Sequence, residues 1–195
     1  MKKILMLAPL VGLVAACQPA AEEEPSVTIV PLTYSCAGQD YGVIAGEGVA
    51  YIDDSEGRKT LDQIPAASGS RYAGEGYGFH MKGNEAILQL DDGEDSCTLI
   101  PFRAGGNEPF WSVSVEGRSM TLARPDFEDV VVPTASVSRT DTGWQFAASA
   151  FTLDVTDQRC DDTMADRSYP FTASVTVGGM EMTGCAGAHF NEGPL

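Results

Sequence analysis

The side chains of this sequence that could do chemistry are few, and three of them lie between Ser68 and Lys82. Ser68 carries a hydroxyl, His80 an imidazole and Lys82 an ammonium, fourteen residues after the serine. A serine, a histidine and an acid can form a nucleophilic triad, here with Ser68 or Ser70. However, the chain has no GxSxG motif, and closeness in sequence alone is a weak indication of a triad. We therefore predict that the protein is not an enzyme.

The lysine ends an alternating run that is typical of a strand. In Tyr77–Lys82, the aromatic and apolar side chains fall on one face, and His80 and Lys82 fall on the other. The aromatic face packs a core, so Lys82 must point outward at the end of the strand. The preceding loop, residues 67–70, consists of small residues that a partner can approach closely. The periodicity does not place Ser68 beside Lys82.

Short alternating strands separated by Gly, Asp and Asn fill the rest of the chain, which predicts an all-β fold. A two-residue hairpin turn is expected at Gly178-Gly179, and only residues 59–67 could hold a helical turn. We place a boundary near residues 100–106, because a cysteine closes the first strand set and a new motif begins there. The prediction is a small antiparallel β-barrel over residues 32–100 and a second small β domain over residues 101–195.

The chain opens with two lysines, an apolar stretch too short to span a bilayer, and the residues VAAC ending at Cys17. This end resembles the lipobox of bacterial lipoproteins, which implies a signal peptide over residues 1–16 and acyl chains on Cys17. An ordinary signal peptide with a chance cysteine is the alternative. Gln18, which is not Asp, implies a lipid-anchored protein in the outer membrane of a Gram-negative bacterium, facing the periplasm. Residues 17–31 are predicted to be a tether.

Four further cysteines remain, Cys36, Cys97, Cys160 and Cys185. In an oxidising compartment they are expected to form two disulfides, and three pairings are possible. We expect Cys36–Cys97 and Cys160–Cys185, because each pair closes one self-contained unit, whereas nested or crossed pairs tie the two halves together. The two histidines and the cysteine spacing do not fit a metal site, so neither a metal nor a cofactor is predicted.

The composition is strongly acidic, with a formal net charge of −16. A nucleic-acid partner is not expected, because a phosphate backbone requires a basic face. Complementary potentials favour a basic protein partner instead. The alternative is that the acidic surface serves solubility alone.

Several short motifs together resemble the family of membrane-bound lysozyme inhibitors that act on c-type lysozyme. They are Tyr34-Ser35-Cys36, ASGSRY over residues 67–72, the strand ending KGNEA at residues 82–86, and the closing Cys97. The resemblance covers about residues 32–100. It implies a small β-barrel with the disulfide Cys36–Cys97, in a lipoprotein that binds c-type lysozyme and protects peptidoglycan.

In that family the serine and lysine loops enter the lysozyme cleft, and these positions carry over to Ser68 and Lys82. Arg71 and Tyr72 match the motif and are expected to shape or flank the loop, and with His80 they complete the expected set of lysozyme-binding residues. His80 stands where the family usually has Trp. This departure removes apolar area from the expected interface, so affinity or the choice of lysozyme is expected to differ. It also places a pH-sensitive group near the lysine.

Residues 101–190 resemble an uncharacterised domain of bacterial envelope lipoproteins, through GNEPFW at 106–111, CDDTM at 160–164 and GCA at 184–186. This resemblance implies no activity. Trp111 is expected to pack in a core strand, and the acids of CDDTM to form a solvated loop beside the disulfide. The leading hypothesis is an inhibitor of c-type lysozyme. The alternative is an envelope binding or structural lipoprotein whose inhibitor-like domain no longer inhibits.

Overall fold

The computed structural model describes residues 29–189, and every regular element in this range is a β-strand. The predicted signal peptide, Cys17 and most of the predicted tether lie outside the described residues. No helix within residues 29–189 is long and apolar enough to cross a membrane.

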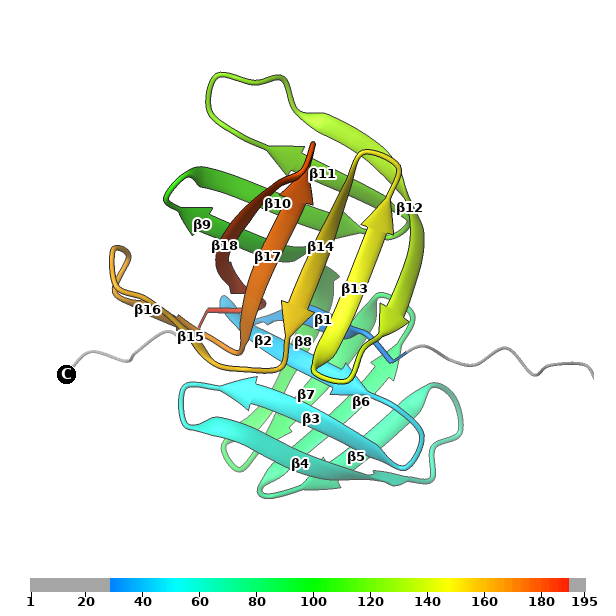
Figure 1. Cartoon of the computed structure of the whole chain (residues 1–195). Helices are drawn as coiled ribbons and strands as arrows, with labels where there is room; N and C mark the ends of the chain where they lie inside the picture. Colours follow the sequence, from blue (N-terminus) through cyan, green and yellow to red (C-terminus); the bar gives the residue numbers. More distant parts are fainter. Residues whose placement is uncertain (1–28, 190–195) are drawn as a thin grey trace, which may run out of the picture.

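The strands form two closed eight-stranded antiparallel barrels and one separate hairpin, which confirms the predicted all-β fold (Figure 1). The first barrel contains β1 (Pro31–Cys36), β2 (Gln39–Ala45), β3 (Val49–Asp54), β4 (Gly57–Ile64), β5 (Ser70–Gly74), β6 (Tyr77–Lys82), β7 (Glu85–Leu90) and β8 (Gly93–Ile100). The second contains β9 (Phe102–Asn107), β10 (Phe110–Glu116), β11 (Ser119–Ala123), β12 (Val130–Arg139), β13 (Gly143–Ala148), β14 (Phe151–Thr156), β17 (Phe171–Val177) and β18 (Met180–Ala186). The hairpin consists of β15 (Cys160–Asp162) and β16 (Arg167–Tyr169).

The first barrel is an uninterrupted meander that closes where β1 pairs with β8. The disulfide Cys36–Cys97 joins two residues that are direct partners in this closing pair, with their Cα atoms 4.2 Å apart. Alternation along each strand fills the interior: Phe79 and Leu88 are cross-strand partners and both are buried. The ring of Phe79 meets Tyr34 edge to face at 5.3 Å between centroids.

The helical turn that residues 59–67 could have held does not form. Residues 57–64 form β4, which pairs with β3 on one side and β5 on the other. Leu61 is fully buried between polar neighbours, so the segment follows the two-residue period of a strand. Pairing on both edges satisfies its backbone groups, which a single helical turn does not achieve.

The second barrel closes where β9 lies between β10 and β18. Here two backbones approach so closely that a Cβ added at Gly184 would lie 2.0 Å from the carbonyl oxygen of Gly105. Only glycine fits at that crossing. The disulfide Cys160–Cys185 ties the β15–β16 hairpin to β18, so each barrel carries one disulfide. The predicted turn at Gly178-Gly179 is confirmed, with positive φ angles of 58° and 81°.

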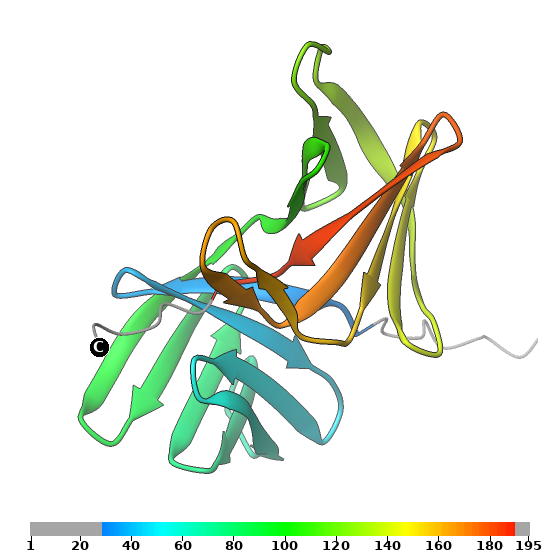
Figure 2. The same cartoon turned by 60° about the vertical axis from the view of Figure 1, so that its left-hand side comes forward.

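The two barrels pack against each other along β1 and β2 (Figures 1 and 2). Ile44 of β2 is buried in the same apolar cluster as the core of the second barrel. The indole Nε1 of Trp144 donates a 2.6 Å hydrogen bond to the carbonyl oxygen of Ile29. Arg58 of the first barrel binds both Asp53 and, across the junction, Asp157. The chain passes directly from one barrel to the other at Pro101.

Candidate functional site

The loop that carries Ser68 packs against the end of β6. The β5–β6 ladder pairs Ser70 with Met81, so Ser68 and Gly69 lie beside the last residues of that strand. Gly69 has φ of +70°, and a Cβ placed there would lie 2.1 Å from the Met81 carbonyl oxygen and 3.3 Å from Lys82 Cβ. Because Gly69 has no side chain, the loop can approach the β6 backbone this closely. The backbone of the serine loop therefore lies beside Lys82. The alternation of the sequence did not predict this neighbourhood.

His80 holds this loop in place. Its Nε2 lies 2.8 Å from the carbonyl oxygen of Ser68. Since a carbonyl oxygen only accepts, the hydrogen bond requires Nε2 to be the donor. His80 therefore contacts the serine loop directly and holds the backbone of Ser68 beside the end of β6.

Lys82 is exposed, and its ammonium makes no hydrogen bond or ion pair with any residue of the described chain. The ladder places Glu85 directly opposite, yet the two side chains form no ion pair. The other lysine in the described range, Lys59, is bound to Glu56 at 3.0 Å. Lys82 is therefore a cation available to a partner on a protein of acidic composition.

A shallow groove of about 350 Å³ extends from Lys82 over the outer face of β6, β7 and β8. The side chains on its outward positions are His80, Lys82, Glu85, Ile87, Ser96 and Thr98. Ile87 is 43% exposed and gives the groove an apolar element. Sequence reasoning did not select Ile87, although its strand parity, opposite to the buried Ala86 and Leu88, indicates an outward apolar side chain.

The remaining predicted residues, Arg71 and Tyr72, lie on opposite faces of β5. Arg71 is exposed and is the cross-strand partner of His80. Tyr72 is only 3% exposed, and its hydroxyl donates a 3.0 Å hydrogen bond to the carbonyl oxygen of Gly46. Its buried ring supports β5 from inside the barrel. Because the ring is buried inside the barrel, Tyr72 has little surface for direct contact with a partner. Its burial favours a supporting role for β5 and the serine loop.

Other ionisable groups of the first barrel have partners that shift their pKa values. Burial raises the pKa of Asp53, although its ion pair with Arg58 opposes the shift. Burial alone would lower the pKa of Arg58, but the carboxylates of Asp53 and Asp157 outweigh it and raise that pKa. Burial also raises the pKa of Tyr77, whose hydroxyl donates to Asp54. These groups bind one another, whereas Lys82 does not.

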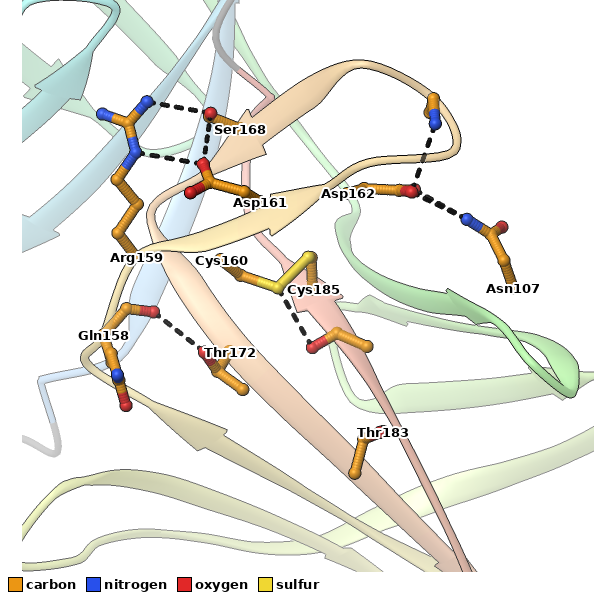
Figure 3. The surroundings of a disulfide bond; sticks show 12 residues. Asn107, Gln158, Arg159, Cys160, Asp161, Asp162, Ser168, Thr172, Thr183 and Cys185 are labelled. Carbon is orange, nitrogen blue, oxygen red and sulfur yellow. Dashed lines mark hydrogen bonds and ion pairs between the residues drawn. A yellow bond between two sulfur atoms is a disulfide. The ribbon is translucent and has the colours of Figure 1, made fainter.

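The motifs of the second barrel form a compact, internally bonded unit (Figure 3). Trp111 is buried as predicted, and its indole Nε1 donates to the Thr183 carbonyl oxygen at 3.2 Å. The expectation of a solvated acidic loop is wrong for Asp162. This residue lies in β15, and its carboxylate accepts hydrogen bonds from Asn107 at 2.8–2.9 Å and from the backbone N–H groups of Met164 and Ala165. Within the described residues, no group of three or more His, Cys, Asp or Glu side chains could hold a metal ion.

Comparison with known families finds one match. Residues 41–96 fit the sequence model of the family described as membrane-bound lysozyme-inhibitor of c-type lysozyme. Neither curated proteins nor solved structures gave a match. The matched segment runs from within β2 into β8 and contains the serine loop, His80 and Lys82. The resemblance that the motifs indicate is confirmed over residues 41–96 of the first barrel.

Proposed function

We propose that the protein is a lipid-anchored inhibitor of c-type lysozyme, and that Ser68 and Lys82 enter the lysozyme active-site cleft. The family match supports the inhibitor role. The observation that carries the mechanism is the exposed, unpaired ammonium of Lys82 beside a serine loop fixed by His80. Both features lie in the segment that matches the family.

The chemistry of the cleft fits these two groups. A c-type lysozyme holds one carboxyl group that is protonated and acts as general acid, and a second that is ionised. The ammonium of Lys82 suits the ionised carboxylate, with which it forms a charge-assisted hydrogen bond. The hydroxyl of Ser68 both donates and accepts, so it suits the group that keeps its proton.

Long-range charge favours the same encounter. The chain carries a formal net charge of −16, and complementary potentials raise association rates with a basic enzyme. A lysine within an acidic surface is then the one cation that enters a cleft lined by carboxylates. Ile87 in the adjacent groove adds apolar contact area where the family's Trp is missing.

Lipid attachment at Cys17 places the inhibitor at the outer membrane, facing the periplasm and the peptidoglycan it protects. We expect Cys17→Ala to release the protein from the membrane fraction while inhibition is retained, because the proposed cleft-binding residues lie in the first barrel. Fractionation after a high-salt wash measures this. A variant that still pellets with the outer membrane would show that the anchor lies elsewhere.

The direct test is a turbidity assay with the purified two-barrel protein and a hen-type lysozyme acting on bacterial cell walls. We expect the clearing rate to fall in proportion to the added protein until the enzyme is saturated. An unchanged clearing rate at saturating protein would reject inhibition and favour the alternative, an envelope binding or structural lipoprotein. Calorimetry with the same lysozyme then separates binding without inhibition from no binding.

A further inference from the structure

A cavity of about 560 Å³ lies in the second barrel at its junction with the first. Its walls come from β9, β10, the segment after β11, the β15–β16 hairpin and the residues after β18, with Thr33, Asp40 and Ile100 contributed by the first barrel. This volume lies in the range of small-molecule binding sites, which are concave and combine apolar walls with a few convergent polar groups. The proposed inhibitory face uses none of these residues.

Three arginines line this cavity, Arg103, Arg124 and Arg167, although the chain has only eight arginines and a large acidic excess. They come from three elements far apart in sequence. Within the described residues none of the three has an ion-pair partner within 4 Å, whereas Arg58 and Arg159 do. Arg124 lies over the ring of Phe127, 4.3 Å from its centroid, and the charge of Arg167 acts on Asp162. Guanidinium groups that line one cavity and form no ion pair within the described residues provide planar donors for a carboxylate or a phosphate.

Two acidic residues also line the cavity, and one of them is already bound. The carboxylate of Asp162 accepts from Asn107 and from two backbone N–H groups. Partial burial alone would raise its pKa, but these hydrogen bonds and the nearby charge of Arg167 outweigh burial and lower it. Asp162 therefore fixes the hairpin that carries Arg167. The second acidic residue of the cavity wall is Asp40, which comes from the first barrel.

The rest of the wall suits a ring or another apolar body. Phe110 is 57% exposed, and Trp111 is held by its indole hydrogen bond. The rings of Tyr169 and His189 lie beside each other, with 6.2 Å between their centroids. The buried hydroxyl of Thr33, which also lines the cavity, has no hydrogen-bond partner among residues 29–189. A buried hydroxyl without a partner costs free energy unless a bound group satisfies it. The cavity thus combines unused donors with aromatic surface.

From these features we infer that the cavity binds a small ligand that carries a carboxylate or phosphate group on a ring or other apolar body. The arginines bind the anionic group, and the aromatic side chains contact the body. The Cys160–Cys185 disulfide and the Asn107–Asp162 contact hold the hairpin wall in position before the ligand arrives, which reduces the entropy lost on binding.

Calorimetry on the purified two-barrel protein tests the inference without lysozyme. Three probes separate the possible sources of the anion: inorganic phosphate, N-acetylmuramic acid as a carboxylate on a sugar ring, and uncharged N-acetylglucosamine. We expect one of the two anions to bind and the neutral sugar not to bind. Binding of phosphate alone assigns a phosphate ligand, and binding of N-acetylmuramic acid alone assigns a ring carboxylate.

Variants locate the site. Arg103→Gln and Arg167→Gln should each weaken anion binding by about tenfold or more, because each removes a charge-assisted donor. Both side chains are exposed, so folding should be unchanged, which thermal unfolding checks. Arg118→Gln is the matched control, since Arg118 is an exposed arginine of the same barrel outside the cavity. It should leave affinity unchanged.

A second readout follows the indole N–H signals by nuclear magnetic resonance. The signal of Trp111 at the cavity wall should shift on anion binding, and that of Trp144, which donates to Ile29, should not. Absence of binding by both anions would overturn the inference. Equal weakening by Arg118→Gln and the cavity variants would also overturn it, because the attraction would then come from overall charge.

Discussion

The two barrels share a strand number and a meander topology, yet their available polar groups lie in different places. In the first barrel the strands follow one another without interruption, and the unpaired Lys82 lies on the outer face. In the second the meander is interrupted between β14 and β17 by the β15–β16 hairpin, and three arginines that form no ion pair within residues 29–189 line a cavity beside it. Because side chains fill the inside of a small closed barrel, new sites must be added outside it or by inserted segments.

The barrels also depend on each other unequally. The core cluster of the second barrel includes Ile44 from the first, and Val30 and Tyr51 pack against it. The cluster of the first barrel contains only residues of its own strands. We therefore propose that residues 32–100 are the self-sufficient unit, and that the second barrel needs the first to cover part of its core.

The largest expected effect concerns the outer face of the first barrel. Lys82→Ala should weaken binding to a c-type lysozyme by roughly 2–5 kcal/mol, since truncating one side of a desolvated charge pair costs about that much. This is on the order of thirty-fold or more in affinity, because about 1.4 kcal/mol is tenfold. The free protein should lose no more than about 0.5 kcal/mol of stability, because the side chain is exposed and unpaired.

Calorimetry and urea unfolding measure the two quantities. Lys59→Ala is the matched control: it removes a lysine of the same barrel whose ammonium is already bound to Glu56. Its affinity for lysozyme should stay within about twofold of wild type. Near-wild-type affinity of the Lys82 variant for lysozyme would mean that the first barrel binds lysozyme through another surface.

The junction between the barrels gives the next largest effect. Arg58→Ala leaves the carboxylate of Asp53 buried without its cation and breaks the contact to Asp157. Since a third of the Arg58 side chain is exposed, the expected loss is about 1–3 kcal/mol in the free energy of unfolding. Asp157→Asn, which keeps the Asp53 pair, should cost less and serves as the control.

The pH dependence of this loss has a definite sign. Burial raises the pKa of Asp53 even with Arg58 present, so its contribution to stability is greatest at acidic pH and is lost as the pH rises through the folded-state pKa. Without Arg58 this pKa rises further. The destabilisation by Arg58→Ala should therefore be larger at pH 7 than at pH 5 in urea unfolding. An equal loss of unfolding free energy at pH 5 and pH 7 would show that Asp53 is not the cause of the destabilisation.

The sequence predicted what depends on strand parity and failed where distant segments meet. The outward position of Lys82 and the buried position of Trp111 follow from alternation, and each disulfide lies within one half of the chain as expected. The contact of His80 with the Ser68 carbonyl was not predictable, because it depends on the β5–β6 register and on the positive φ of Gly69.

The second barrel shows the same limit more strongly. Asn107 and Asp162 are 55 residues apart, and the cavity arginines come from three elements. Each is an ordinary polar residue in its local sequence, and only barrel closure and the hairpin tied by the disulfide bring them together. The acids of CDDTM were therefore interpreted as solvated, although Asp162 anchors the hairpin to β9.

A smaller effect is expected at the serine. Ser68→Ala should weaken lysozyme binding by about 0.5–1.5 kcal/mol, because a neutral hydroxyl contact contributes about that much. The His80 contact is to the Ser68 backbone carbonyl, so the loop should keep its position in this variant. Calorimetry of the Ser68→Ala, Lys82→Ala and double variants measures whether the two groups act together. A loss at Ser68 that exceeds the loss at Lys82 would reverse the proposed roles.

The smallest effect concerns the hairpin that distinguishes the second barrel. A hydrogen bond from the Ser168 hydroxyl at 2.5 Å, together with Arg159, lowers the pKa of Asp161. A carboxyl whose pKa is lowered on folding stabilises the fold above its unfolded pKa, and this contribution is lost as the pH falls through the folded-state pKa.

Ser168→Ala should raise the Asp161 pKa toward its ordinary value. It should leave Asp162 unchanged, because the hydrogen bonds of that carboxylate come from Asn107 and the backbone. Titration of both carboxyl carbons by nuclear magnetic resonance measures this, and a shift of both groups together would mean that the hairpin had moved as a whole.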